Sequence, residues 1–270
     1  MKTDYHVHTT LSPDGNSTLE EYCAAAAAVG CTELCITNHM DLGYHDKAFE
    51  GIVSAEGLRE SILQWQKAQK AHPSLSLRLG MEVGYKPETH HESALLLSGA
   101  PFDFIINSVH DVGDADPYED SYYAGRSRRE AYEPYMQAVY DSLDAAYDYS
   151  VIGHYGYVMR KSPYLCPIIE PAEFRDLIDA TLMRLIYLGK GLEVNTSTLK
   201  TLASPMPGKG ILRRYRELGG EIITIGSDAH SASRLCSGFA EACALLQSLG
   251  YSYLTRFREM KPEFYPIPSV

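Results

Sequence analysis

The sequence is short of basic residues, because 24 lysines and arginines face 35 aspartates and glutamates. The resulting formal net charge of −11 argues against a nucleic-acid-binding surface, which is normally basic. A small anionic ligand is not excluded, since a local site can be positive on an acidic protein. No apolar run approaches the length of a membrane span, and the first residues lack a signal-peptide core. We therefore expect a cytoplasmic protein without membrane or nucleic-acid partners.

Closely spaced cysteines are also absent. The six cysteines show no Cys-x-x-Cys or similar zinc or redox spacing, and they are Cys23, Cys31, Cys35, Cys166, Cys236 and Cys243. We interpret them as small buried thiols of a protein in a reducing compartment.

Apart from these absences, short apolar, β-rich runs alternate regularly with longer helical patterns. The predicted strands are Thr3–His8, Glu33–Thr37, Ser76–Val83, Phe104–Val109, Ser150–Gly153, Gly191–Asn195 and Glu221–Gly226. The predicted helices lie around Thr18–Val29, Ala55–Ala71, Glu88–Leu97, Ser127–Tyr147, Pro171–Leu188, Lys209–Leu218 and Gly238–Leu249. Ser17 and Thr18 precede acidic residues as a helix N-cap, and Gly30, Gly189 and Gly219 follow helical runs as stop signals. Seven β/α repeats predict an α/β fold with a parallel sheet, closed or nearly closed into a barrel, in a single domain over residues 1–270.

Potential metal ligands lie where the predicted strands end. His6 and His8 are two residues apart and so project from the same face of a strand, and Asp14 follows after a short turn. Further strand ends carry His39, Glu82, His110, His154, Asp228 and His230. The C-terminal ends of barrel strands form one rim, which would bring these side chains together. The sixth strand is an exception, because Glu193–Ser197 is polar without a strong ligand.

Ordinary explanations exist for individual histidines. Taken alone, His6 and His8 with the following Ser-Pro-Asp-Gly turn are compatible with a surface segment, since these turn residues are common. The remaining histidines fall in predicted loops or helix starts, where we interpret them as solvated surface residues: His45, His72, His90 and His91. The repetition at six strand ends is what favours a metal centre.

Six short motifs carry the candidate ligands: His6-Val7-His8-Thr9, Ile36-Thr37-Asn38-His39, Gly80-Met81-Glu82-Val83, Ser108-Val109-His110, Gly153-His154 and Gly226-Ser227-Asp228-Ala229-His230. In this order they resemble the polymerase and histidinol phosphatase (PHP) family over nearly the whole chain. The length and the absence of a polymerase region point to the stand-alone histidinol-phosphatase branch. The resemblance implies a distorted seven-stranded, TIM-barrel-like (β/α)7 barrel with three divalent metal ions, for which zinc, iron and manganese are all suitable.

The resemblance also implies which residues hold each ion. One ion would be bound by His6, His8, Glu82 and Asp228, a second by Glu82, His110 and His154, and a third by Asp14, His39 and His230. Asn38 is a departure, since the family often has an acid there, and it adjoins a ligand. Three carboxylates against three divalent ions would leave a site charge of about plus three, which attracts a phosphate dianion.

The implied reaction is hydrolysis of L-histidinol phosphate in histidine biosynthesis, by attack of a metal-bound hydroxide. Catalytic roles are expected for Asp228, His230 and Arg160, and substrate contacts for Arg160, Lys200 and Tyr155. Lys200 is a departure, because the family often has an arginine in that loop, and a lysine is a point charge where arginine is a fork. Both cations also have a simpler interpretation as solvated loop residues.

Several alternatives stay open at this point. The enzyme could act on another small phosphate or nucleotide, or the chain could be a metal-stabilised binding domain without catalysis. Cys166 is not expected to be a covalent nucleophile, because no phosphate-cradling loop follows it. The stretch Ala115–Arg129, which is rich in Asp, Tyr and Arg, is a candidate lid or specificity loop, and Tyr157 a candidate for the pocket wall. The oligomeric state is not indicated.

Overall fold

The computed structural model describes residues 1–268. Its strands are β1 (Thr3–Asp4), β2 (Glu33–Ile36), β3 (His39–Met40), β4 (Ser76–Gly84), β5 (Phe104–Ser108), β6 (Val151–Ile152), β7 (Gly191–Asn195), β8 (Ile223–Gly226), β9 (Tyr253–Arg258) and β10 (Lys261–Pro266). Its α-helices are α1 (Leu19–Val29), α2 (Ala55–Ala71), α3 (His90–Leu97), α4 (Asp120–Tyr123), α5 (Arg128–Ser142), α6 (Arg175–Tyr187), α7 (Leu199–Leu202), α8 (Lys209–Glu217) and α9 (Phe239–Ser248). Three short 3₁₀ turns are η1 (Lys47–Phe49), η2 (Tyr157–Met159) and η3 (Ala232–Arg234).

The strands form a parallel sheet in the order β1-β2-β4-β5-β6-β7-β8, with β3 paired to β4. Because β2 and β3 pair with successive parts of β4, they act as one strand interrupted at Thr37 and Asn38. The N-terminal segment then bonds to the last strand of the sheet. The Tyr5 N–H donates to the Ile225 carbonyl (3.0 Å), and Val7 forms a parallel bridge with Ala229. These bonds bring the sheet to a nearly closed, seven-stranded barrel.

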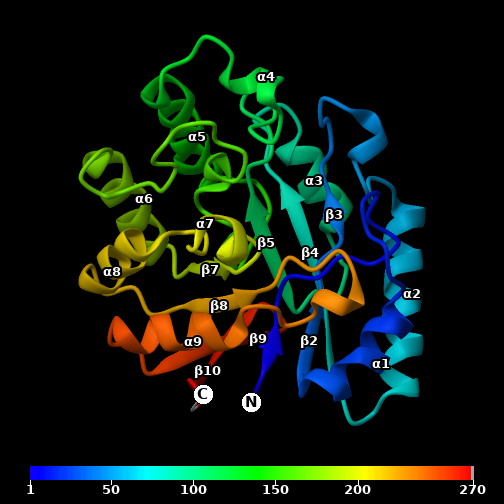
Figure 1. The fold of residues 1–270 in the computed structure, drawn as a ribbon. Helices are drawn as coiled ribbons and strands as arrows, with labels where there is room; N and C mark the ends of the chain where they lie inside the picture. The colour runs from blue at the N-terminus through cyan, green and yellow to red at the C-terminus, as the bar shows by residue number, and fades with distance from the viewer. Residues whose placement is uncertain (269–270) are drawn as a thin grey trace.

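Helices surround the barrel, with α1 and α2 on one flank and α5, α6 and α8 on the other (Figure 1). The helix ends follow the predicted signals. Thr18 caps α1 in a capping box with Glu21, and Gly30 ends the helix in the left-handed conformation (φ 68°). Every residue of β4 after Ser76 is buried, as expected for a strand that has helices on one face and the barrel interior on the other.

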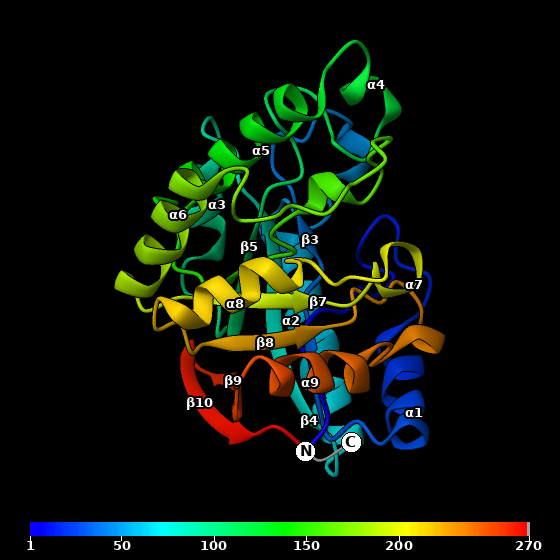
Figure 2. The same ribbon diagram turned by 60° about the vertical axis from the view of Figure 1, so that its left-hand side comes forward.

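Two clusters of apolar side chains fill the barrel and its surroundings. In β5, Ile105 packs into the large cluster beneath the helices, whereas Phe104 and Ile106 on the opposite face belong to a small separate cluster. That small cluster fills the barrel interior and includes Phe257 of β9. The β9–β10 hairpin lies at the end of the barrel near both termini, as the red ribbon in Figure 2 shows. It therefore closes the N-terminal end of the barrel and leaves the opposite rim for the site.

The predicted barrel class is confirmed, and most element bounds agree within a few residues. The predicted first strand is shorter, and the predicted helix over 127–147 ends at Ser142. The β9–β10 hairpin was not predicted. Cys166 is exposed, which corrects its interpretation as a buried thiol, while the other five cysteines are buried. Among residues 1–268, no helix is long and apolar enough to cross a membrane.

Candidate metal centre

Nine side chains with metal-ligand chemistry gather at the C-terminal rim of the barrel. They come from the loop after β1, from β3 and β4, and from the segments that follow β5, β6 and β8. The carboxylate of Glu82 in β4 lies at their centre. Its Oε2 is 3.1 Å from His6 Nε2 and 3.4 Å from His8 Nε2, and its Oε1 is 2.8 Å from His154 Nε2 and 3.2 Å from His110 Nε2. The Oε2 atom also lies 3.2 Å from His39 Nδ1, so this carboxylate faces five imidazoles, three on Oε2 and two on Oε1.

Asp228 completes the first of these groups. Its Oδ1 is 3.8 Å from His6 Nε2 and 3.5 Å from His8 Nε2. Asp228 adopts a left-handed backbone conformation (φ 53°), which is strained for a residue with a side chain. The buried carboxylate of Asp4 accepts hydrogen bonds from the N–H (2.9 Å) and the Oγ–H (2.5 Å) of the preceding Ser227. Asp4 therefore holds the turn that presents Asp228.

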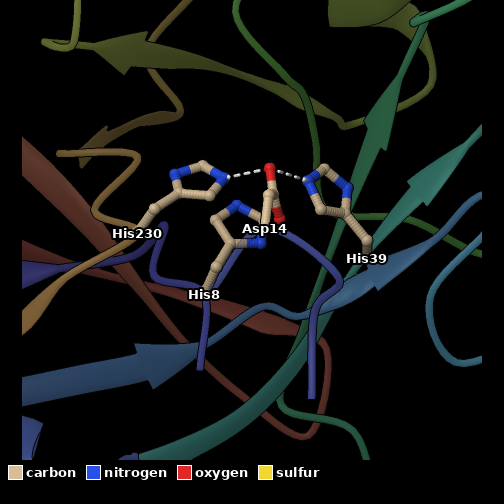
Figure 3. A group of neighbouring side chains, drawn as sticks. All are labelled: His8, Asp14, His39 and His230. Carbon is tan, nitrogen blue, oxygen red and sulfur yellow. Dashed lines mark ion pairs between the residues drawn. The ribbon is translucent and has the colours of Figure 1, made fainter. Parts of the chain in front are cut away.

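A third group lies closer to solvent and is drawn in Figure 3. Asp14 points between two imidazoles, with its Oδ2 2.8 Å from His230 Nε2 and 3.8 Å from His39 Nε2. The His8 ring stacks on both His39 and His230, at 4.3 Å and 4.2 Å between ring centroids. The imidazole of His8 consequently connects this group with the one around Asp228.

The chemistry of these atoms fits bound cations. Three buried atoms that face the centre of the cluster have no hydrogen-bond partner among the described residues: His6 Nε2, His8 Nε2 and Glu82 Oε2. Buried polar atoms are nearly always satisfied, so three such atoms pointing together indicate a missing positive partner. Groups of imidazole nitrogens and carboxylate oxygens within ligand reach are typical of zinc and similar divalent ions.

The pKa shifts show that the carboxylates and the protonated imidazoles of the cluster stabilise each other's charges. Burial disfavours the charged form of His6, but the nearby carboxylates of Glu193, Glu82 and Asp228 hold its pKa well above its usual range. Burial likewise opposes ionisation of Glu82, yet His6, His39 and His110 keep its pKa well below the usual range. A divalent cation at these atoms would take the place of the protons.

Two buried carboxylates at the centre were not predicted as site residues. Asp41, just after β3, has its Oδ1 2.5 Å from His110 Nδ1 and its Oδ2 2.9 Å from His39 Nδ1. Glu193 of β7 has its Oε1 2.5 Å from His6 Nδ1. His6 and His110 contact these acids through Nδ1, the ring nitrogen opposite the metal-facing Nε2, an arrangement that orients histidine ligands. In His39 the Nδ1 atom lies near both Asp41 and Glu82. In the sequence, the only sign of such a partner is an aspartate or glutamate near the end of a predicted strand.

A cavity of about 480 Å³ opens above the cluster. Arg160, after η2, lines it and places its Nη2 3.1 Å from Asp228 Oδ2. Tyr157 also lines the cavity, as predicted. Tyr155 does not: it is fully buried in the core, which corrects its predicted role as a substrate contact. Lys200 of α7 is exposed and is not part of the described cavity wall.

The outer wall of the cavity comes from two loops. One is the segment after β3, including Tyr44, His45 and Phe49, and the other includes Tyr118 and Glu119 from the predicted lid. The His45 ring bridges them, with Nδ1 2.9 Å from Asp111 Oδ1 and Nε2 3.3 Å from Glu119 Oε1. His45 is an exposed residue, as expected from the sequence, and its side chain also lines the cavity.

The fold and the site together define a barrel protein with a histidine- and carboxylate-rich metal centre at the carboxyl ends of its strands. The family model of the PHP domain matches residues 4–197 of this chain. The histidinol-phosphatase of Lactococcus lactis subsp. lactis (strain IL1403) is 30% identical over 262 residues, covering 96% of each chain. A probable histidinol-phosphatase of Clostridium acetobutylicum is 27% identical over 251 residues, covering 92% of this chain and 94% of its own. The chain belongs to the PHP domain family.

A solved structure shows the same likeness in three dimensions. The histidinol phosphate phosphatase of Lactococcus lactis subsp. lactis Il1403, crystallised with zinc, L-histidinol and phosphate, superposes with a TM-score of 0.86. It is 30% identical in sequence, and the match covers 97% of this chain and 98% of that one. The family resemblance seen in the sequence motifs is thereby confirmed.

Zinc is expected to raise the melting temperature of metal-free protein. A ligand that binds only the folded state at one hundred times its dissociation constant contributes about 2.7 kcal/mol, or roughly 5–10 °C in a chain of this size. Differential scanning fluorimetry of chelator-treated protein with added zinc measures the shift. Magnesium, which prefers oxygen ligands, is the control and should shift it less. An unchanged melting temperature with zinc, manganese and iron alike would contradict a metal centre.

Proposed function

We propose that this protein is a metal-dependent phosphatase that hydrolyses L-histidinol phosphate to L-histidinol and phosphate in histidine biosynthesis. The observation that carries the proposal is a cluster of nine ligand-type residues, seven of which line one cavity, with the Arg160 guanidinium on the cavity wall. The likeness over almost the full length to the Lactococcus lactis histidinol-phosphatase supports the choice of substrate. As part of the same proposal, the protein acts in the cytoplasm on a small molecule.

We assign three divalent ions to the three groups of ligands. The first is held by His6, His8, Glu82 and Asp228, the second by Glu82, His110 and His154, and the third by Asp14, His39 and His230. Zinc is the first choice because the Lactococcus lactis structure contains it, and the donor atoms also suit iron and manganese.

The charge of the filled site differs from the sequence-based value. Asp41 and Glu193 contact ligand histidines directly, so five carboxylates rather than three surround the ions. Three divalent ions would then leave a net charge of about plus one, or about plus two with Arg160. The floor of the cavity remains positive, which favours a phosphate dianion over neutral ligands.

The residues around the cavity have distinct roles in this proposal. Bound divalent ions would polarise the phosphoryl oxygens and lower the pKa of a bound water from about 15.7 to about 7. Arg160 binds the phosphate through charge-assisted hydrogen bonds. Asp228 and His230, which both line the cavity, are the further residues proposed to take part in catalysis. His230 Nδ1 lies 3.0 Å from the Asp228 carbonyl oxygen, which directs its Nε2 toward Asp14.

The far wall of the cavity suits the organic half of the substrate. It carries the carboxylates of Asp46 and Glu119 together with the aromatic rings of Tyr44, Phe49 and Tyr118. L-Histidinol phosphate has an imidazole at the end opposite its phosphate and an amine between the two. A negative, aromatic wall facing a positive floor therefore matches the charge distribution of this substrate.

A phosphate-release screen tests the proposal. Zinc-, manganese- and iron-loaded enzyme would be assayed with L-histidinol phosphate, nucleoside monophosphates and phosphodiesters at equal concentrations. The proposal expects kcat/KM to be highest for L-histidinol phosphate. A higher kcat/KM for a nucleotide would show that the enzyme acts on another small phosphate. No turnover of any ester by metal-loaded protein would favour a binding domain without catalysis.

Hydrolysis should proceed in one displacement. Cys166 is exposed, and no cysteine of residues 1–268 lines the cavity, so a covalent thiol intermediate has no candidate there. Direct attack by water on phosphorus inverts its configuration. Hydrolysis of a chiral, oxygen-isotope-labelled phosphorothioate ester in isotopically labelled water, read by ³¹P NMR, is expected to show inversion, and retention would indicate a phosphoenzyme.

Replacing Lys200 by Ala is expected to change kcat/KM by less than about fivefold. Lys200 is exposed on α7 and lies outside the described cavity wall, so its ammonium remains solvated. An exposed cation of this kind contributes little through its charge, at most about 0–1 kcal/mol. Steady-state kinetics measures the effect. A loss comparable to that of an Arg160 variant would show that α7 carries Lys200 to the phosphate.

A further inference from the structure

Strand β7 contributes no residue to the three groups of metal ligands, yet it places a carboxylate among them. The side chain of Glu193 is 1% exposed. Its Oε1 lies 2.5 Å from His6 Nδ1, and its Oε2 accepts a hydrogen bond of 2.7 Å from the His154 backbone N–H. His6 and His154 belong to different metal groups. Glu193 thus contacts both groups from behind.

We propose that Glu193 is a positioning residue that fixes the tautomer of His6 and the backbone of His154. With its proton on Nδ1, directed at Glu193, the His6 ring presents the Nε2 lone pair to Glu82 and Asp228. This role rests on the metal occupancy set out in the proposed function.

The surroundings of Glu193 are built around this contact. A side chain at Gly226 of β8 would place its Cβ 2.2 Å from Glu193 Oε1 and 2.4 Å from His6 Cβ, so only glycine leaves room for the pair. The Asn195 side-chain amide points its nitrogen to both carboxylate oxygens at 3.3 Å. Every described polar contact of Glu193 therefore brings a donor to an acceptor oxygen.

The His154 contact has a second consequence. His154 has a positive φ of 20°, which residues with side chains rarely adopt. Its Nε2 is 2.8 Å from Glu82 Oε1, so the ring of this strained residue already reaches the centre of the cluster. The hydrogen bond from its N–H to Glu193 helps to hold the conformation that brings the ring there.

Exchanging the carboxylate for an amide separates these roles. Glu193→Gln keeps the size of the side chain but offers one acceptor oxygen and one NH₂ donor. The His154 N–H can only donate, so the amide oxygen must turn to it and the NH₂ group must face His6. The imidazole can accept at Nδ1 only by moving its proton to Nε2, which removes the lone pair from the metal. We expect zinc affinity to fall about tenfold to a hundredfold for the His6 group.

The matched control is Glu33→Gln. Glu33 in β2 is also a 1% exposed carboxylate of a barrel strand, and it accepts hydrogen bonds from Tyr5, Ser76 and Arg78 instead of from a ligand residue. Its amide variant should lose stability without losing zinc affinity. A general effect of removing a buried charge would weaken zinc binding in both variants.

The first measurement needs no substitution of Glu193. Long-range ¹H–¹⁵N spectra of the zinc-loaded wild-type protein, with His6 assigned by a His6→Gln variant, should show the His6 proton on Nδ1. Finding it on Nε2 would overturn the proposal, whether or not the variants fold.

The second measurement is zinc titration of metal-free wild type, Glu193→Gln and Glu33→Gln against a chromophoric chelator. Weakened binding of one zinc ion in Glu193→Gln alone supports the proposal, and equal affinity in wild type and Glu193→Gln contradicts it. No substrate is used in either experiment. The outcome is therefore independent of whether L-histidinol phosphate is the substrate.

Discussion

Glu82→Gln is expected to cause the largest loss of metal and of activity among single substitutions in this protein. The two oxygens of the Glu82 carboxylate face five imidazoles, and Glu82 is the bridge between two of the proposed metal groups. Substitutions of residues that only orient a ligand typically cost tenfold to a hundredfold in affinity or activity. Losing a shared ligand charge should therefore exceed about a hundredfold in zinc affinity and in kcat/KM.

The geometry makes Glu82→Gln a stringent test of the bridging role of Glu82. Glutamine retains an oxygen that can face one group, but its NH₂ then faces the other, where it is a donor directed at a cation. We expect elemental analysis to find fewer bound ions in Glu82→Gln than in wild type, with the fold intact by circular dichroism. Glu33→Gln again controls for loss of a buried carboxylate elsewhere in the barrel. Wild-type metal content and turnover in Glu82→Gln would refute its bridging role.

Arg160→Ala is expected to lower kcat/KM by about tenfold to a hundredfold while metal content changes little. A hydrogen bond to a charged group contributes about 1.5–3 kcal/mol, and one that strengthens in the transition state contributes more. The guanidinium contacts Asp228 Oδ2, whereas the oxygen facing His6 and His8 is Oδ1, so the metal-facing oxygen keeps its partners in the variant.

Two further variants separate phosphate binding from general charge. Arg160→Lys retains the charge without the fork and should recover only part of the loss. Lys161→Ala removes a neighbouring exposed cation, whose Nζ lies 4.5 Å from the centre of the Tyr118 ring, and should leave turnover nearly unchanged. Steady-state kinetics with metal analysis on all three variants provides the comparison. Loss of zinc from Arg160→Ala would instead make Arg160 a support for Asp228.

The rim of the barrel was predictable because its chemistry is tied to the ends of the strands. Parallel strands in a barrel point the same way, so a histidine that ends one strand must lie near an acid that ends another. This reasoning places His6, Glu82 and Asp228 together without any knowledge of loop structure. The broken strand formed by β2 and β3 was harder to predict, because Asn38 lies inside an otherwise continuous motif.

The roles of the remaining site residues depend on where their side chains point, which the periodicity of the sequence does not predict. Glu193 is one acid in a strand end that lacked a histidine, and only the pairing of β7 with β8 turns it toward His6. Tyr155 and Tyr157 are two residues apart but follow the unusual backbone of His154, and only Tyr157 reaches the cavity. The β9–β10 hairpin was not predicted, because the charged residues beside the inward-facing Phe257 obscure the apolar pattern of a strand in the sequence.

The seam between the N-terminal segment and β8 has a consequence for how the active protein is made. His6 and Asp228 are separated by most of the chain, and Phe257 reaches back to Tyr5, whose hydroxyl accepts its N–H hydrogen bond (2.8 Å). Closing such distant contacts is slow, and during synthesis it must wait until the ribosome has released the last strands. A nascent chain that ends before β8 contains His6 and His8 but lacks Asp228, one of their carboxylate partners. Tight metal binding therefore occurs late in folding, after the barrel has closed.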